Sequence, residues 1–186
     1  MADDIKSKDL ALQVQKKILG KMASKNLSKM LIDERTAEVL DELYKVVKDY
    51  KSKKVAAKLV KDLMKIMIKI GLLQRNDSFS ADEKRHAESL HQKTKHAALT
   101  IVSFYEVDFT FDKYVLSKQI TDGRNLVHQL VTGHLKDKSK ERINSTFDVL
   151  SDVDFLEKLF DSQGSYRPHL KVIAGRIKEL IEEKVL

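Results

Sequence analysis

The stretch Lys53–Leu73 reads KKVAAKLVKDLMKIMIKIGLL and carries the strongest information about the fold. A helix turns about 100° per residue, and at that spacing five lysines fall within an arc of roughly 100°, while apolar side chains cover most of the remaining circumference. An ordinary surface helix buries about one face, so this helix must be covered on almost every other side. We therefore expect either the central helix of a bundle or a helix lining an apolar cavity that a ligand fills. The lysine stripe, predicted to face solvent, consists of Lys54, Lys58, Lys61, Lys65 and Lys69.

Helical periodicity extends from this stretch through most of the chain, and β-type alternation is nearly absent. Ser80 followed by Glu83 is a capping-box pattern, which marks the start of a helix. Asp112 and Ser151 are candidate N-caps, and Pro168 suits the first turn of a last helix. The expected helices cover about residues 9–24, 36–50, 53–73 and 80–104, a segment after 112, then 139–150, 152–161 and a segment after 168. The sequence therefore predicts an all-α fold, a single compact bundle of six to eight helices.

Positive charge is concentrated in the first part of the chain. The 186 residues carry a formal charge of +7, and residues 1–75 hold 18 Lys and Arg against 10 Asp and Glu. This asymmetry favours an anionic partner such as a membrane surface, nucleic acid or an acidic protein, unless the lysines serve only solubility. Nucleic acid is not expected, because aromatic residues are few and neither a recognition helix nor a stacking motif is present.

The helix expected at residues 9–24 is amphipathic, with an apolar arc of roughly 160° flanked by lysines. Such a helix can lie in a membrane interface with its ammonium groups on lipid phosphates, or it can dock its apolar face on the bundle. Lys16, Lys17 and Lys21 are the candidate membrane-contacting residues. The first 15 residues lack the apolar core of a signal peptide, and lysines interrupt the most apolar stretch of the chain, so we expect a cytoplasmic protein with reversible membrane association.

The helix expected at residues 80–104 combines small side chains on its inner face with a basic outer surface. Ala87 and Thr94 are among the small side chains, which allow either close helix packing or an internal void. Arg75, His91 and Lys93 are candidate members of a basic rim, where a phosphorylated head group would bind above an apolar pocket. The alternative for each of them is an ordinary solvated side chain.

The sequence contains no catalytic or metal-binding constellation. The chain has no cysteine and its six glycines are isolated, which excludes thiolate chemistry and a glycine-rich phosphate loop. His86, His91 and His96 are five residues apart and so do not share a helix face as metal ligands at i and i+4 do. The acids around Asp152 lack the spacing of a calcium loop and are interpreted as capping residues. We therefore expect a protein that is not an enzyme and that uses no metal or cofactor.

Several segments resemble a known family. They are Ala11–Leu19 (ALQVQKKIL), Val39–Lys45 (VLDELYK), Arg75–Phe79 (RNDSF), Val102–Asp112 (VSFYEVDFTFD) and Ser151–Leu156 (SDVDFL). In this order they are similar to the tumor necrosis factor alpha-induced protein 8-like family, and the similarity runs from about residue 8 to the end of the chain. Two stretches depart from the usual family sequence: Lys138–Arg142 (KSKER) and Phe147–Asp152 (FDVLSD). Both lie away from the expected basic rim, so they put a shared partner-binding surface in doubt more than the cavity.

The resemblance implies a helical domain around a large apolar central cavity, with a mobile amphipathic first helix. It implies that the chain divides into a flexible N-terminus at 1–8, the basic helix at 9–24 and the cavity-bearing domain at 25–186. Members are described as binding and transferring phosphoinositides and as regulating inflammation, cell death and small-GTPase signalling. The basic pair of the family falls on Lys16 and Lys17, and its head-group region falls on Arg75, His91 and Lys93. His91 stands where some members have arginine, which weakens a fixed positive charge there at neutral pH.

The leading hypothesis is a non-enzymatic protein that binds and transfers phospholipids, phosphoinositides in particular, with the membrane surface as its partner and no nucleic acid. The alternative is a protein–protein adaptor in apoptosis, immune or small-GTPase signalling, with helices packed on one another and no lipid ligand. The residues expected to line the cavity around the acyl chains are Leu59, Leu63, Ile66, Met67, Ile70, Ile101 and Phe104.

Overall fold

The computed structural model describes residues 6, 9, 13 and 33–186. Within this part the chain forms seven α-helices and one short 3-10 helix, which confirms the predicted all-α bundle. The helix expected at residues 9–24, with Lys16, Lys17 and Lys21, lies outside the described residues apart from positions 9 and 13. The helices are α3 (Glu34–Tyr50), α4 (Lys53–Arg75), α5 (Ala81–Glu106), η2 (Asp108–Thr110), α6 (Lys113–Val131), α7 (Asp137–Leu150), α8 (Val153–Phe160) and α9 (Arg167–Glu182).

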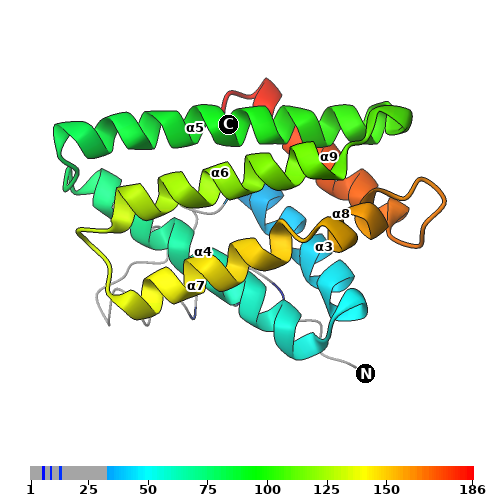
Figure 1. The fold of residues 1–186 in the computed structure, drawn as a ribbon, viewed down its shortest axis with the longest axis horizontal. Helices are drawn as coiled ribbons and strands as arrows, with labels where there is room; N and C mark the ends of the chain where they lie inside the picture. The colour runs from blue at the N-terminus through cyan, green and yellow to red at the C-terminus, as the bar shows by residue number, and fades with distance from the viewer. Residues whose placement is uncertain (1–5, 7–8, 10–12, 14–32) are drawn as a thin grey trace.

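The helices cross in layers (Figure 1). Helix α5 packs on α6 and on α9, and α3 packs on α9 and on α4. Helix α4 runs obliquely behind α7, which packs on α4 and α6. The connection between α4 and α5 returns the chain over the end of α4, so that the first half of α5 lies near the last turns of α4 (Figure 1).

Helix α4 joins the two largest hydrophobic clusters among the described residues. Leu59 and Met64 belong to a cluster that also contains buried side chains of α3, α8 and α9. Ile66 belongs to a second cluster, with buried side chains of α6 and α7. These neighbours cover α4 from several directions, as its nearly continuous apolar circumference predicts for a central helix.

Helix caps follow the sequence closely, with one exception. The backbone N–H of Glu83 donates to the Ser80 hydroxyl at 3.2 Å, and the Ser80 N–H donates to the Glu83 carboxylate at 2.8 Å, which completes the predicted capping box. Asp112 caps α6 as predicted. The prediction that Ser151 begins the next helix is wrong, because its N–H donates to the Phe147 carbonyl and ends α7, and Asp152 caps α8 instead.

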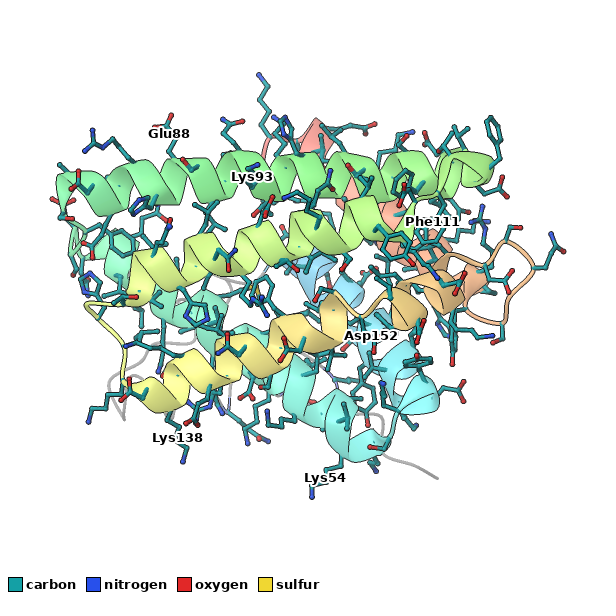
Figure 2. All side chains as sticks on the ribbon, in the orientation of Figure 1. Lys54, Glu88, Lys93, Phe111, Lys138 and Asp152 are labelled. Carbon is teal, nitrogen blue, oxygen red and sulfur yellow. The ribbon has the colours of Figure 1, made fainter. Side chains whose placement is uncertain are left out.

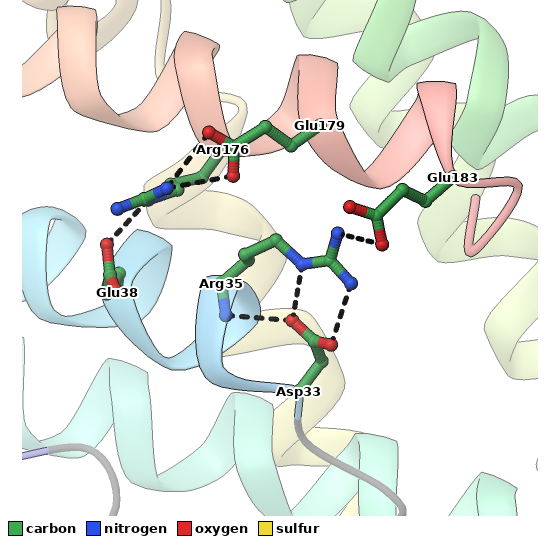
Figure 3. Close-up of polar contacts among 6 residues, drawn as sticks. All are labelled: Asp33, Arg35, Glu38, Arg176, Glu179 and Glu183. Atoms are coloured by element: carbon green, nitrogen blue, oxygen red, sulfur yellow. Dashed lines mark hydrogen bonds and ion pairs between the residues drawn. The ribbon is translucent and has the colours of Figure 1, made fainter.

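A polar cluster joins the first described helix to the last (Figure 3). Asp33 caps α3 by accepting from the Arg35 N–H at 2.8 Å, and the Arg35 guanidinium pairs with both Asp33 and Glu183. Arg176 on α9 donates to Glu38 on α3 at 2.6 Å. The cluster adds directional contacts to the apolar packing between α3 and α9.

Replacing Asp33 by alanine should destabilise the fold by about 1 kcal/mol, the usual cost of losing an N-cap. The hydrogen-bonded Arg35 guanidinium lowers the pKa of Asp33 from 3.8 to about 2. Because the folded pKa is the lower one, the ionised carboxylate contributes stability above about pH 4, and this contribution is lost as the pH falls toward 2. Urea denaturation of the two proteins at several pH values checks this. The difference in unfolding free energy between the parent protein and Asp33→Ala should shrink as the pH falls from about 4 to 2. A difference that stays constant with pH would contradict this prediction.

Candidate functional site

A pocket of about 660 Å³ lies where the end of α4 meets the first half of α5, with α6 closing one side. We call it the α4–α5 pocket. Its volume falls in the range of small-molecule sites. The apolar lining residues are Ile70, Phe79, Ala87, Leu90 and Leu130, and the polar ones are Gln74, Asp77, Lys84, Glu88, His91 and Thr94.

Local sequence explains why the space exists. Phe79 is 6% exposed and packs edge-on against the His134 ring, with centroids 5.6 Å apart, so it fastens the loop before α5 to the body of the bundle. Ala87 and Thr94 then present small side chains where a leucine would fill the gap. Further along the same helix, Ala98 is buried in close packing. Both outcomes expected for the small inner face therefore occur on α5, a void beside Ala87 and Thr94 and close packing one turn later at Ala98.

Charges of both signs surround the pocket. Lys84 pairs with Asp77 at 2.8 Å, and this hydrogen bond lowers the pKa of Asp77. Glu88 and His91 are exposed lining residues, and Figure 2 shows Glu88 on α5. The mouth therefore offers hydrogen-bond donors without a strong excess of positive charge.

The predicted site residues divide among several places. Ile70 and His91 line the α4–α5 pocket together. Arg75, the last residue of α4, and Lys93 on α5 are exposed and do not line it. Figure 2 shows Lys93 on α5. The other residues predicted to line a cavity pack in the hydrophobic clusters: Leu59, Leu63, Met67, Ile101 and Phe104 in the cluster of α3, α4, α8 and α9, and Ile66 in the cluster of α4, α6 and α7.

The lysine stripe of α4 differs from the solvated stripe that the sequence predicts. Lys54, Lys58 and Lys61 are exposed, as expected. The Lys65 side chain is only 16% exposed, and the partly buried Lys69 ammonium donates to the Ser139 hydroxyl of α7 at 2.8 Å. The prediction is wrong for these two residues because α7 lies against the second half of the stripe.

Two absences hold for the described residues. None of their helices combines the length and the apolar character that a membrane crossing requires. No three of their His, Asp or Glu side chains come together in a group able to hold a metal ion.

Comparison with known proteins places the chain in a family. The family model described as tumor necrosis factor alpha-induced protein 8-like matches residues 5–184. The chain belongs to this family. Membership supports a role in regulating inflammation or cell death.

Curated members of the tumor necrosis factor alpha-induced protein 8-like family match over nearly their whole length. Tumor necrosis factor alpha-induced protein 8 of Bos taurus is 47% identical over 98% of this chain and 92% of its own. The 8-like protein 3 of Xenopus laevis is 45% identical over 99% and 92%, and the 8-like protein 2 of Xenopus laevis is 47% identical over 97% of each chain.

The fold of this family member is also found in a distant solved structure. The C-terminal region of G-protein interacting protein 1 from Dictyostelium discoideum superposes with a TM-score of 0.70, covering 85% of this chain and 96% of that one. The two sequences are 16% identical, so this likeness concerns the helical architecture alone.

Proposed function

We propose that this family member is a non-enzymatic phospholipid-binding and transfer protein that acts on phosphoinositides in signalling of inflammation or cell death. The observation that carries the proposal is the α4–α5 pocket, whose apolar walls lead to exposed polar residues at its mouth. In this arrangement part of an acyl chain contacts Ile70, Leu90 and Leu130, and the head group lies toward His91 and Lys84. The protein would be cytoplasmic and would associate with membranes reversibly.

Energetics favour the acyl chain as the main source of affinity. Each buried methylene contributes about 0.8 kcal/mol, so six methylenes in the pocket contribute about 5 kcal/mol. The head group gains less, because Lys84 must exchange its pairing with Asp77 for a phosphate, and that exchange between exposed charges is worth little. The His91 imidazole can donate a hydrogen bond to the head group.

Attraction to acidic membranes depends on residues outside the pocket. Arg75 and Lys93 are exposed on α4 and α5, the two helices that form most of the pocket, and are available to lipid phosphates. Lys16, Lys17 and Lys21 remain the predicted contacts of the N-terminal helix, and each cation near an anionic surface adds about 1 kcal/mol. We expect the pocket to select the lipid and these cations to bring the protein to the bilayer.

Ala87→Phe should weaken binding to phosphoinositide-containing vesicles about tenfold, because a ring in the pocket displaces roughly two methylenes of the acyl chain. The control is Ser89→Phe, which adds the same ring at an exposed position of α5 that does not line the pocket. Vesicle sedimentation measures both. Equal binding of neutral and acidic vesicles, or equal loss in the two variants, would contradict the proposal.

A second candidate function is a protein–protein adaptor, and exposed aromatic residues favour it. Phe109 is 88% exposed and Tyr114 is 68% exposed, on either side of the turn between η2 and α6. Aromatic side chains are enriched at the centres of protein interfaces. If small GTPases are the partners, Phe109→Ser with Tyr114→Ser should abolish their capture by the purified protein and leave vesicle binding unchanged.

A further inference from the structure

A basic groove of about 590 Å³ runs between α4 and α7. We call it the α4–α7 groove. It shares no lining residue with the α4–α5 pocket. Figure 2 shows Lys138 projecting from the first turn of α7. The groove is lined by Ala57, Lys58, Lys61, Asp62, Lys65, Lys138, Glu141, Arg142 and Ser145.

The charges of the groove do not balance. Its lining holds five basic and two acidic side chains. Three of the bases converge on one carboxylate: Asp62 is 4% exposed and lies 3.3 Å from Lys58, 3.3 Å from Lys65 and 3.4 Å from Arg142. A single carboxylate cannot neutralise three cations.

The other two basic residues add to the excess. Lys61 and Lys138 are exposed and form no ion pair within the part of the chain that the structure describes. Just beyond the lining, Lys69 contacts the neutral Ser139 hydroxyl instead of a carboxylate. The positive charge of the groove therefore exceeds its negative charge.

Burial makes this excess of positive charge unfavourable. It lowers the pKa of Lys65 and of Lys69, and the neighbouring Arg142 guanidinium lowers both further. Both shifts favour the neutral amine, first because burial removes water from the ammonium group and second because the cations repel one another where solvent screens them poorly. An anion in the groove would relieve that repulsion.

We propose that the α4–α7 groove binds a compact polyanion that carries two or more phosphate groups. Arginine and lysine are the side chains that proteins use for phosphate, and the Ser145 hydroxyl, which accepts from Lys58 at 2.9 Å, adds a neutral polar group. The volume suits a small molecule. This site is separate from the lipid pocket and goes beyond the proposed function.

Larger anionic partners fit the groove less well. Ala57 is the sole apolar residue of the lining, so an acidic peptide would find no anchor for its side chains. No aromatic residue lines the groove, so nucleic-acid bases would find no stacking platform. The phosphates of a soluble polyphosphate and those of a lipid head group share the same chemistry, and the experiment separates these two sources.

Inositol hexakisphosphate is the soluble probe, and isothermal titration calorimetry on the full chain measures its binding. Lys61→Ala with Lys138→Ala should weaken binding at least tenfold, and higher salt should weaken binding further. Both residues are exposed and unpaired, so unchanged thermal melting is expected. The control is Lys158→Ala with Lys171→Ala, which removes two exposed lysines of α8 and α9 and should change the affinity less than twofold.

The outcomes separate the groove from the pocket. Ala87→Phe should leave binding of the soluble probe unchanged, so a failure of the lipid proposal does not affect this one. If the soluble probe does not bind but the groove variant loses binding to vesicles containing polyphosphorylated lipid, the lipid head group is the source of the phosphates. If neither the probe nor these vesicles respond to the groove variant, or if the control variant weakens binding equally, the proposal is overturned.

Discussion

Phe155→Ala should lower the free energy of unfolding by about 4 kcal/mol, within the range measured for buried phenylalanines. Phe155 of α8 is 1% exposed and packs against the Tyr50 ring, with centroids 5.3 Å apart. It belongs to the cluster that joins α3, α4, α8 and α9. Removing the ring loses its transfer free energy and leaves a void that neighbours on four helices cannot all close.

The matched control for this prediction is Phe109→Ala. Phe109 is 88% exposed, so the same change in chemistry should alter the stability by less than about 0.5 kcal/mol. Urea denaturation followed by circular dichroism measures both variants, and the slope against urea should stay the same. A loss below about 2 kcal/mol for Phe155→Ala would contradict close packing of this cluster.

The fold could be predicted largely because its signals are local. The apolar circumference of α4 requires neighbours on several sides, whichever helices these are. The capping box of Ser80 and Glu83 lies within four residues, so its geometry follows from the sequence alone. Ser151 was assigned to the wrong helix because serine also suits a helix end, where its hydroxyl bonds the preceding turn.

The α4–α5 pocket was predictable only in part. The sequence correctly indicates Ile70 as an apolar lining residue and His91 as a basic residue of the site, and both line the pocket. The small side chains of Ala87 and Thr94 indicate either a void or close packing, without deciding between them. Leu130 completes the wall from α6, and the sequence does not reveal which turn of α6 faces α5. The grouping of Arg75 and Lys93 with His91 rests on charge and on the family resemblance, and neither determines the direction of a side chain.

The α4–α7 groove could not be predicted from the sequence. The pairing of Asp62 with Lys58 and Lys65 is visible, since these residues lie one helical turn apart. Arg142 lies 80 positions further along the chain. It approaches Asp62 only because Ile143 packs into the cluster of α4, α6 and α7 and fixes the rotation of α7.

Asp62→Asn should lower the free energy of unfolding by about 2 kcal/mol. The amide keeps the shape of the carboxylate but leaves Lys65 and Arg142 without their shared counter-charge in a half-buried site. The expected loss is below the usual cost of breaking a buried pair because Lys58 is 60% exposed and stays solvated. The control is Asp137→Asn, whose 93% exposed carboxylate pairs with Lys140 and should contribute less than about 1 kcal/mol.

The same substitution should act in the opposite direction on anion binding. Asp62 is one of the two acids in the groove, so its neutralisation should raise the affinity for inositol hexakisphosphate severalfold while the protein becomes less stable. An anion that binds only the folded state stabilises a protein more when it binds more tightly, so the probe should stabilise Asp62→Asn more than the parent protein. A saturating concentration of the probe should therefore narrow the difference between their melting temperatures. If the role of Asp62 is purely structural, Asp62→Asn should still lower the stability, but the probe should leave the difference between the two melting temperatures unchanged. Thermal melts of both proteins with and without probe therefore test whether Asp62 substitutes for a missing anion between α4 and α7.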